Sequence, residues 1–327
     1  MTMRREKPLA LIEQWSPNFS QTICKELVHK SFLSEVFLTD SRQVANDCFL
    51  ISALLPKTHF YYNDVPIRSQ FYDSALILEV CRQVSIYIAH IFYAISFDYK
   101  FIFDSANFTQ YLGHKPANNI DKHKAIIHTK VINKKTKKDS LCGLEIDMMV
   151  YIDQELYACK SMKFSWVAPK MWDKLRRISQ QQDSANLEIK PILKDIVCKE
   201  HISNVVIGNF LECTNYFQAT IIADKTHPAF FDHPLDHISG ILIIEAIKQF
   251  GIATCAKVFN CKPTKLQFKS IQVEFKNFCE FYNPNICYVS KEHICLQDGE
   301  ISMDIVIKSA KLHSVSSSVK FIMGGGR

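Results

Sequence analysis

The sequence predicts an α+β protein in which one fold occurs twice along the chain. Residues 241–251 and, earlier, 71–89 are apolar on almost every side of a helix, and such helices lie inside proteins. After each of them, apolar and polar residues alternate with a period of two, which indicates antiparallel strands. A long buried helix followed by such strands needs a sheet curved about it, because helix against sheet is one of the few two-layer arrangements.

The two halves also match each other in sequence. LILEVCRQV aligns with LIIEAIKQF, so that Glu79 matches Glu245 and Gln83 matches Gln249, 166 residues apart. Further matches keep the same order: Val28-x-Lys30 with Val197-x-Lys199, Lys57-Thr58-His59 with Lys225-Thr226-His227, Asp64 with Asp232, and 146–150 with 303–307. Ordered matches at a nearly constant spacing indicate an internal duplication.

Composition sets limits on the function. The chain has 327 residues, enough for two domains with cores, and 47% of them are hydrophobic, which indicates a folded protein. A net charge of +6 suits an acidic partner or a phosphorylated substrate, but is too small to argue for nucleic acid, and none is expected. With nine glycines and no phosphate-cradling glycine loop, a nucleotide-binding site is also not expected.

Cysteine usage and the amino terminus favour a cytoplasmic protein. Twelve cysteines occur without a Cys-x-x-Cys pair, and no signal peptide is recognised, so we expect free thiols in a reducing compartment. The apolar stretch 84–95 is interrupted by Ser85 and His90, and we expect it to be too short to span a bilayer.

The first half is expected to contain two strands, a helix and three more strands. Residues 1–25 show little pattern. Strands are predicted at 35–40 and 47–55, and a helix that Asp73 or Ser74 caps and that ends near Ala94. Further strands are predicted at 125–132, 144–152 and 156–166, with the lysine-rich run 130–139 as the turn between two of them.

A polar stretch after Ala168 predicts a linker over 169–190, with one short helix at 171–181. The predicted domains are therefore 1–168 and 191–327. The second half repeats the order, with strands at 204–210 and 216–223, a helix at 238–258, and strands at 266–275, 285–291, 301–308 and 314–323.

Glu245 is the first candidate for chemistry. A carboxylate on a buried helix is costly unless it is paired or protonated, and burial is expected to raise its pKa into the range useful for general acid/base catalysis. The alternative is an ion pair with Lys248, three residues further on. Glu79 presents the same two alternatives with Arg82.

The turn before the second helix, Asp232-His233-Pro234-Leu235-Asp236-His237, offers other groups. His233 is a candidate base or hydrogen-bond donor near neutral pH, and His237 the more exposed member of the turn. A His-x-x-x-His pair also suggests a metal, but no third ligand stands nearby, so no metal is expected. Backbone N–H groups near Gly240 suit a thioester oxygen or an oxyanion, and Gly240 permits close approach.

This turn carries a resemblance to a known family. Phe231 to His237, followed by Gly240 and Glu245-Ala246, resembles the signature of the A-factor biosynthesis hotdog-repeat proteins. More distantly it is similar to the hotdog β-hydroxyacyl-carrier-protein dehydratases, which have a His-Pro-type turn, a glycine, and a helical glutamate five residues after it. The resemblance covers both halves and implies a tandem, double hotdog, each half a long central helix wrapped by an antiparallel sheet.

The resemblance implies an acyltransferase of γ-butyrolactone or butenolide signal synthesis. It would move a β-ketoacyl group from acyl carrier protein or CoA to the hydroxyl of dihydroxyacetone phosphate or a similar small acceptor, without a cofactor. Glu245, His233 or Glu79 would handle the proton, while Gly240 and His237 would contact substrate. Lys248, Arg82 or Arg68 would neutralise the phosphate. In the dehydratases, the turn histidine of one subunit works with the helical acid of the other, which here pairs His233 with Glu79.

Two departures from the family pattern keep alternatives open. Lys248 stands where these proteins usually have arginine, and Val65 stands where the first-half counterpart of His233 would be. A dehydratase or thioesterase acting on acyl thioesters is one alternative, and a non-catalytic acyl-binding module is another. The basic run from Lys130 to Lys138 is either a solvated hairpin or a docking surface for an acidic carrier protein.

Overall fold

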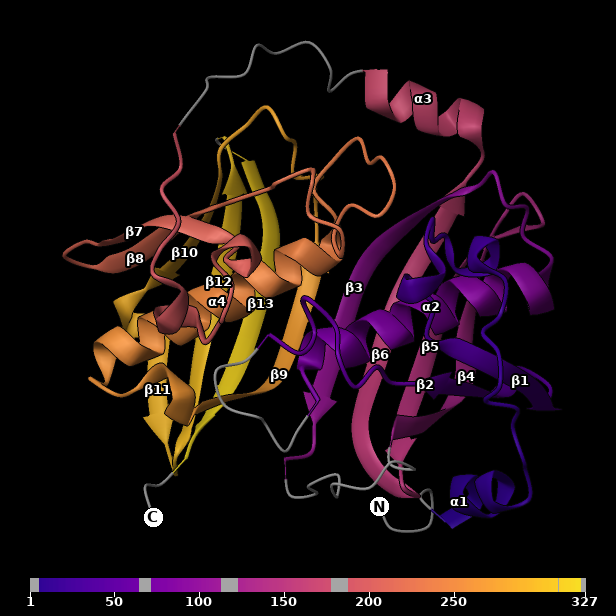
Figure 1. Cartoon of the computed structure of the whole chain (residues 1–327). Helices are drawn as coiled ribbons and strands as arrows, with labels where there is room; N and C mark the ends of the chain where they lie inside the picture. The colour runs from indigo at the N-terminus through magenta and orange to yellow at the C-terminus, as the bar shows by residue number, and fades with distance from the viewer. Residues whose placement is uncertain (1–5, 65–71, 113–122, 178–187, 311, 325–327) are drawn as a thin grey trace. The chain divides into compact units, whose positions relative to one another are not determined.

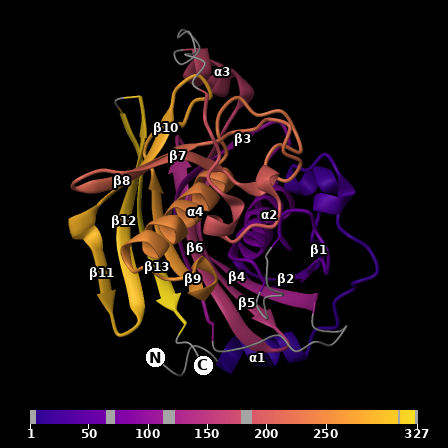
Figure 2. The same cartoon turned by 60° about the vertical axis from the view of Figure 1, so that its left-hand side comes forward.

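The computed structural model describes residues 6–64, 72–112, 123–177, 188–310 and 312–324. Contacts divide the chain into two compact units: residues 1–59, 70–103 and 108–172 form unit 1, and residues 60–69, 104–107 and 173–327 form unit 2. In each unit one long helix lies across an antiparallel sheet (Figures 1 and 2). The predicted α+β architecture is therefore confirmed, while the domain limits 1–168 and 191–327 stay a prediction.

Among the described residues, unit 1 contains six strands, which follow one another in an antiparallel sheet. Its strands are β1 (Leu38–Ala45), β2 (Cys48–Leu54), β3 (Lys100–Gln110), β4 (Lys124–Lys137), β5 (Ser140–Ile152) and β6 (Glu155–Val167), and their spatial order is β1-β2-β4-β5-β6-β3. Two 3-10 turns, η1 (Lys25–Val28) and η2 (Leu33–Glu35), precede β1. The central helix α2 (Ser74–Tyr93) follows β2, as the sequence predicts.

Unit 2 repeats this plan. Its elements are η4 (Lys194–Val197), η5 (Ile202–Asn204), β7 (Ile207–Glu212), β8 (Tyr216–Ile221), α4 (Gly240–Val258), η6 (Pro263–Lys265), β9 (Leu266–Phe275), β10 (Asn285–Ser290), η7 (Lys291–His293), β11 (Ile294–Gln297), β12 (Glu300–Ser309) and β13 (Leu312–Met323). The strand order β7-β8-β10-β12-β13-β9 is that of unit 1, with β11 added beside β12. Glu79 and Glu245 thus lie on equivalent helices, as the internal repeat predicts.

Both central helices begin at a side-chain cap. The carboxylate of Asp73 accepts a hydrogen bond from the Ala75 N–H at 2.8 Å, and the Ser239 hydroxyl accepts one from the Leu242 N–H at 3.4 Å. These caps satisfy backbone donors that the first helical turn leaves unpaired. Ala94, in the left-handed region with φ 53°, ends α2.

The expectation that the apolar helix of the first half is too short for a bilayer was wrong. By length and composition α2 could cross a membrane, but 83% of its most apolar window is buried inside the protein. Within unit 1 the helix is the core of the domain: its buried residues include Leu76, Val80 and Val84. Burial explains the composition of α2 without a membrane.

Three local features differ from the expectations. Residues 6–13 form helix α1, whose Ile12 packs with Leu50 and Tyr151, although this region showed little pattern. Strands β3 and β11 were not predicted. The turn expected over 130–139 comprises only Lys138 and Asp139, whose positive φ values of 51° and 60° suit a two-residue hairpin that matches strand twist.

The linker region also differs in detail. Helix α3 (Pro169–Arg177) begins two residues earlier than the predicted 171–181, and residues 178–187 lie outside the described part of the chain. Its buried residues are Trp172 and Arg176, and the second of these contributes to the site described below.

Candidate functional site

The carboxylate of Glu79 is surrounded by donors in the core of unit 1. Arg82 donates to it from Nε at 2.8 Å and from Nη2 at 2.9 Å, and the Lys30 ammonium lies 3.1 Å away. The amide of Gln83 donates to the same carboxylate at 3.0 Å. One anion therefore holds two cations and an amide.

This environment determines the ionisation of Glu79. Desolvation by burial raises the pKa of the carboxyl group, but Arg82 and Lys30 lower it more, so that the pKa lies well below its ordinary value. The sequence-based argument that burial raises the pKa of the helical glutamate therefore does not hold for Glu79. Its partners outweigh the burial.

Glu245 has an equivalent but looser environment in unit 2. Lys248 lies 2.8 Å from one carboxylate oxygen, and Lys199 lies 3.4 Å from the other. The amide of Gln249 donates to Glu245 at 2.9 Å. Lys199 is the counterpart of Lys30 in the repeat, so a buried lysine from the turn before β1 or β7 faces the helical glutamate in both units.

The two glutamines hold the central helices to the segments before the first strands. Gln83 accepts from the Phe37 N–H at 3.0 Å and donates to the Glu35 carbonyl at 2.7 Å. Gln249 makes the same pair of bonds in unit 2, accepting from Val206 and donating to Asn204, both at 2.9 Å. The Glu-x-x-basic-Gln pattern thus has a partly structural role in both units, because its glutamine joins the central helix to the segment before the first strand.

A third repeated contact involves the histidines of the Lys-Thr-His segments. His59 lies 3.1 Å from Glu35, and the equivalent His227 lies 2.8 Å from Asn204. Both histidines are largely buried at the ends of their segments. These contacts fit a structural role, which is the more frequent role for histidine at such positions.

Residues 60–64 belong to unit 2, although they precede α2 in the sequence. Asp64 accepts from the backbone N–H groups of Glu200 and His201, both at 3.1 Å, and from the Asn204 amide at 2.8 Å. The Asn204 amide also donates to the Phe60 carbonyl at 2.9 Å. This segment closes the polar network around η5.

His233, in the turn before α4, is oriented by the carboxylate next to it. Its Nδ1 lies 2.7 Å from Asp232 Oδ1, and Asp232 is buried whereas the imidazole is 35% exposed. An ionised carboxylate only accepts hydrogen bonds, so Nδ1 carries a proton, and in the neutral imidazole Nε2 then has the lone pair. His233 therefore has the tautomer that a general base needs.

The second histidine of the turn repeats the arrangement. His237 Nδ1 lies 2.6 Å from Asp236 Oδ1, and Asp236 in turn accepts from Arg176 of α3 at 3.1 Å. The sequence repeat Asp-His-x-x-Asp-His thus forms two Asp–His pairs. From the sequence alone, no roles were predicted for Asp232, Asp236 or Arg176. The adjacent Asp and His residues in the sequence could have indicated the two Asp–His pairs.

Gly240 is the first residue of α4, where backbone N–H groups are available for an anion or a polarised carbonyl. A methyl group added at Gly240 would meet only the Phe275 ring, at 3.5 Å, which is an ordinary contact. The protein itself therefore does not require glycine here. The same room would let a ligand approach this backbone closely.

Two predicted positions cannot be placed. Arg68, a candidate phosphate ligand, and Val65, the counterpart of His233, lie outside the described residues. The pairing of His233 with Glu79 stays a prediction as well, because the two residues belong to different units.

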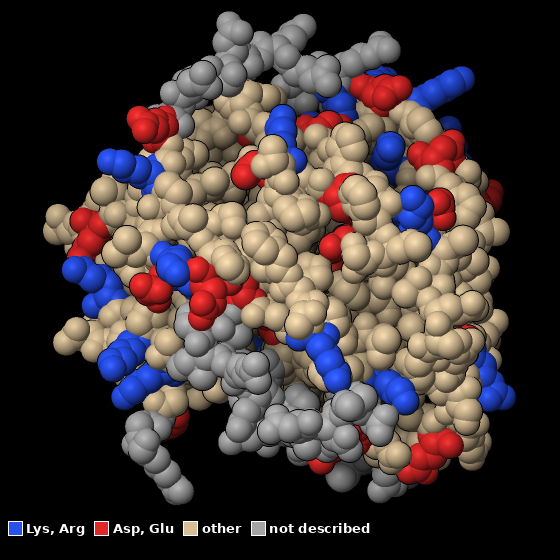
Figure 3. Space-filling view, viewed as in Figure 1, with Lys and Arg blue, Asp and Glu red and all other residues tan. Residues whose placement is uncertain are grey.

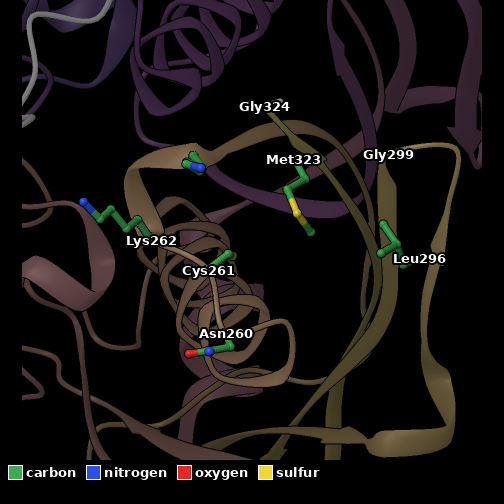
Figure 4. Close-up of a pocket in the computed structure, with 8 residues that line it drawn as sticks. Asn260, Cys261, Lys262, Leu296, Gly299, Met323 and Gly324 are labelled. Carbon is green, nitrogen blue, oxygen red and sulfur yellow. The ribbon is translucent and has the colours of Figure 1, made fainter. Parts of the chain in front are cut away.

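Charge and cavities elsewhere do not extend this site. On the face shown in Figure 3, basic and acidic side chains are interspersed. A cavity of about 540 Å³ lies beyond the end of α4, where Cys261, Lys262, Leu296 and Met323 line it (Figure 4). It contains none of the candidate residues. Within the described ranges, no three His, Cys, Asp or Glu side chains gather as a metal site would require.

Comparisons with known proteins cover most of this chain. The family model of the A-factor biosynthesis hotdog domain matches residues 13–168 and 180–310. A Streptomyces virginiae protein named 2-oxo-3-(phosphooxy)propyl 3-oxoalkanoate synthase is 24% identical over 86% of this chain and 90% of its own. A Streptomyces griseus protein of the same name is 22% identical over 88% of this chain and 95% of its own.

Solved structures identify the fold. A structure described as an oleoyl thioesterase from Lactobacillus plantarum superposes with a TM-score of 0.51 at 8% identity, covering 85% of this chain and 97% of that one. At such low identity the likeness shows the fold alone, and with the family match it confirms the predicted tandem hotdog.

Proposed function

Because both halves match its model, this chain belongs to the A-factor biosynthesis hotdog family, and we propose that it is a β-ketoacyl transferase. The acyl donor is a thioester of acyl carrier protein or CoA, and the acceptor is the hydroxyl of dihydroxyacetone phosphate or a similar small molecule. The relatives' name describes such a product: a 3-oxoalkanoate ester of an alcohol that carries a ketone and a phosphate. We also propose that the reaction takes place in the cytoplasm, and the twelve cysteines without disulfides support this.

The observation that carries the proposal is the Asp232–His233 pair in the turn that precedes α4. His233 Nε2 takes the proton of the acceptor hydroxyl, and the oxygen attacks the thioester carbonyl. The C–O bond forms, the C–S bond breaks, and the imidazolium returns its proton to the leaving thiolate. Backbone N–H groups near Gly240 stabilise the oxyanion.

The roles of Glu245 and Glu79 as proton acceptors stay predictions, and the charges around them favour positioning instead. Each carboxylate is nearly fully buried between two cationic side chains. Each cluster of one anion and two cations therefore has a net charge of +1. Lys248 in unit 2, or Arg82 in unit 1, is then oriented to receive the acceptor's phosphate. His233 is the more accessible base.

A decisive assay mixes the purified protein with a β-ketoacyl carrier protein, with and without dihydroxyacetone phosphate, and follows both the thioester and the phosphorylated ester by mass spectrometry. Thioester loss that requires the acceptor and yields the ester supports transfer. Loss at the same rate without the acceptor indicates a thioesterase, and loss of water from a β-hydroxyacyl substrate indicates a dehydratase. Acyl chains that bind without turnover indicate a binding module.

A further inference from the structure

Arg176, a buried residue at the end of α3, makes four hydrogen bonds in unit 2 that the proposed reaction does not use. Its Nη1 and Nη2 atoms each donate to a different oxygen of Glu280 at 2.7 Å. The Nε atom donates to Asp236 Oδ2 at 3.1 Å, and Nη2 also donates to the Asp236 carbonyl at 2.8 Å. Arg176 is 4% exposed and Glu280 is 7% exposed.

These contacts continue to the second histidine of the turn. Asp236 accepts from Arg176 with one carboxylate oxygen and contacts His237 Nδ1 at 2.6 Å with the other. The ring of Phe278 lies 4.9 Å from the guanidinium carbon and 4.8 Å from the His237 ring centre. The turn is also tied to the same segment by the Ile238 N–H, which donates to the Cys279 carbonyl at 2.9 Å.

The chemistry of the group explains why an arginine is suited here. A planar guanidinium can donate to one carboxylate in parallel and to a second partner from its other edge, which a lysine ammonium cannot do with the same geometry. Burial lowers the pKa of Arg176, but Glu280 and Asp236 raise it more, so the group stays charged. One cation thus joins α3, the 278–280 segment and the 236–238 part of the turn.

We propose that Arg176 is a positioning residue of the acyl-transfer site, holding Asp236 and, through it, His237 and the turn that carries His233. The assignment of Arg176 to an acyl-transfer site rests on the proposed function. The positioning of the turn by Arg176 does not depend on that function. Arg176 itself takes no part in bond making. It determines where the imidazoles stand before the acceptor binds, and small displacements of reacting groups lower rates steeply.

The test uses variants that separate positioning from folding. Arg176→Met alone leaves Glu280 buried without its cation and is at risk of not folding. Arg176→Met/Glu280→Gln removes both members of the buried pair and keeps their approximate volume. Asp236→Asn keeps the Arg176–Glu280 pair and removes only the charge that faces the turn. Lys174→Met, at an exposed position of the same helix, is the matched control.

Two measurements are made on the full-length protein. Hydrogen–deuterium exchange of peptides that cover 230–239 is expected to accelerate at least about tenfold in the double variant and in Asp236→Asn, with peptides within α4 unchanged. In the transfer assay, kcat is expected to fall by about 10- to 100-fold with the KM for the thioester within about twofold, while Lys174→Met matches the wild type.

The outcomes are distinguishable. Unchanged exchange of 230–239 in folded variants overturns the proposal, and so does faster exchange with an unchanged kcat, because the turn would then move without consequence. A fall in thermal stability with a normal kcat per folded molecule makes Arg176 merely structural and also overturns it. If the wild type transfers no acyl group at all, the proposed function fails, and the exchange measurement still decides whether Arg176 positions the turn.

Discussion

At the scale of single residues, His233 differs from the helical glutamates in being accessible. Its side chain is 35% exposed, whereas that of Glu245 is 1% exposed. We expect His233→Asn to lower kcat by about 10²- to 10⁴-fold, the usual contribution of a general base, with little change in KM. Steady-state acyl transfer measures this, and His293→Asn, at an exposed histidine of η7, is the control. A wild-type rate in His233→Asn would exclude it as the base.

A substitution at Gly240 can separate an effect on ligand binding from an effect on protein stability. Since the Phe275 ring leaves room for a methyl group, Gly240→Ala should keep the thermal stability of the wild type or raise it slightly. If the thioester carbonyl approaches the helix start closely, the same variant should lose roughly 10-fold or more in kcat/KM. Calorimetry and transfer kinetics on one sample compare the two effects. Full activity would argue that the oxyanion is bound elsewhere.

The ionisation of Glu79 makes a prediction about stability and pH. Because its folded pKa lies below the ordinary value of 4.5, Glu79 stabilises the protein above that pH, and the stabilisation is lost as the pH falls below it. Glu79→Gln leaves Arg82 and Lys30 without their anion and should cost about 3–5 kcal/mol at pH 7. Urea unfolding of both proteins between pH 7 and pH 3 should show this difference shrinking at low pH. A constant difference would contradict the assignment.

The sequence predicts only part of the site at this scale. The ion pairs of Glu79 with Arg82 and of Glu245 with Lys248 follow from helical spacing, so they were predictable as alternatives. The lysine that approaches each glutamate from the preceding turn is about 50 residues distant, and no spacing rule connects the two. Arg176 is 60 residues from Asp236, and its role becomes visible only once the chain is folded.

At the scale of elements, the central helices of the two units are packed differently at one position. Gly251 of α4 lies against the buried ring of Phe321, and an added methyl group would come within 2.6 Å of it. The counterpart in α2 is Ser85, whose hydroxyl donates to the Cys81 carbonyl. The same helix thus accepts a side chain in unit 1 that unit 2 has no room for.

We therefore expect Gly251→Ala to destabilise the protein by about 1–3 kcal/mol through overpacking, despite the higher helix propensity of alanine. The mirror change Ser85→Ala should have a much smaller effect. Thermal unfolding of the two variants beside the wild type provides the comparison. Equal effects would mean that the Phe321 ring moves aside readily.

Elements with strong periodicity were the ones that the sequence predicted well. Both central helices and most strands were placed within a few residues, because burial imposes a clear pattern on them. Helix α1 has eight residues, of which Pro8 and Ile12 are buried, so its apolar pattern is too short to recognise. The β4–β5 hairpin was predicted with too long a turn, because its exposed lysines look like loop residues although they lie in a strand.

At the scale of the whole molecule, a net charge of +6 raises the question of an acidic partner. The end of the β4–β5 hairpin is exposed and rich in lysine, and Lys134 there is already paired with Asp47 at 2.8 Å. Lys135→Glu/Lys137→Glu leaves that pair intact and lowers the net charge to +2. If the hairpin docks acyl carrier protein, this variant should associate more slowly and with a weaker salt dependence, while kcat at saturation stays nearly unchanged.

The control reverses two lysines of unit 2, Lys257→Glu/Lys308→Glu, which lowers the net charge by the same amount. Stopped-flow association with a labelled carrier protein at several salt concentrations compares the three proteins. If both double variants slow association equally, the net charge is responsible and the hairpin is an ordinary solvated surface.

Because residues 60–64 belong to unit 2, the second half of the chain is not a complete folding unit by itself. A fragment that encodes only residues 173–327 would lack Asp64, which accepts from the Glu200 and His201 backbone, and Tyr61, whose ring lies 4.4 Å from the Lys199 ammonium. Expressed alone, such a fragment should be insoluble or poorly folded, although it contains every strand from β7 to β13. A deletion of the first half would therefore also remove part of the second folding unit.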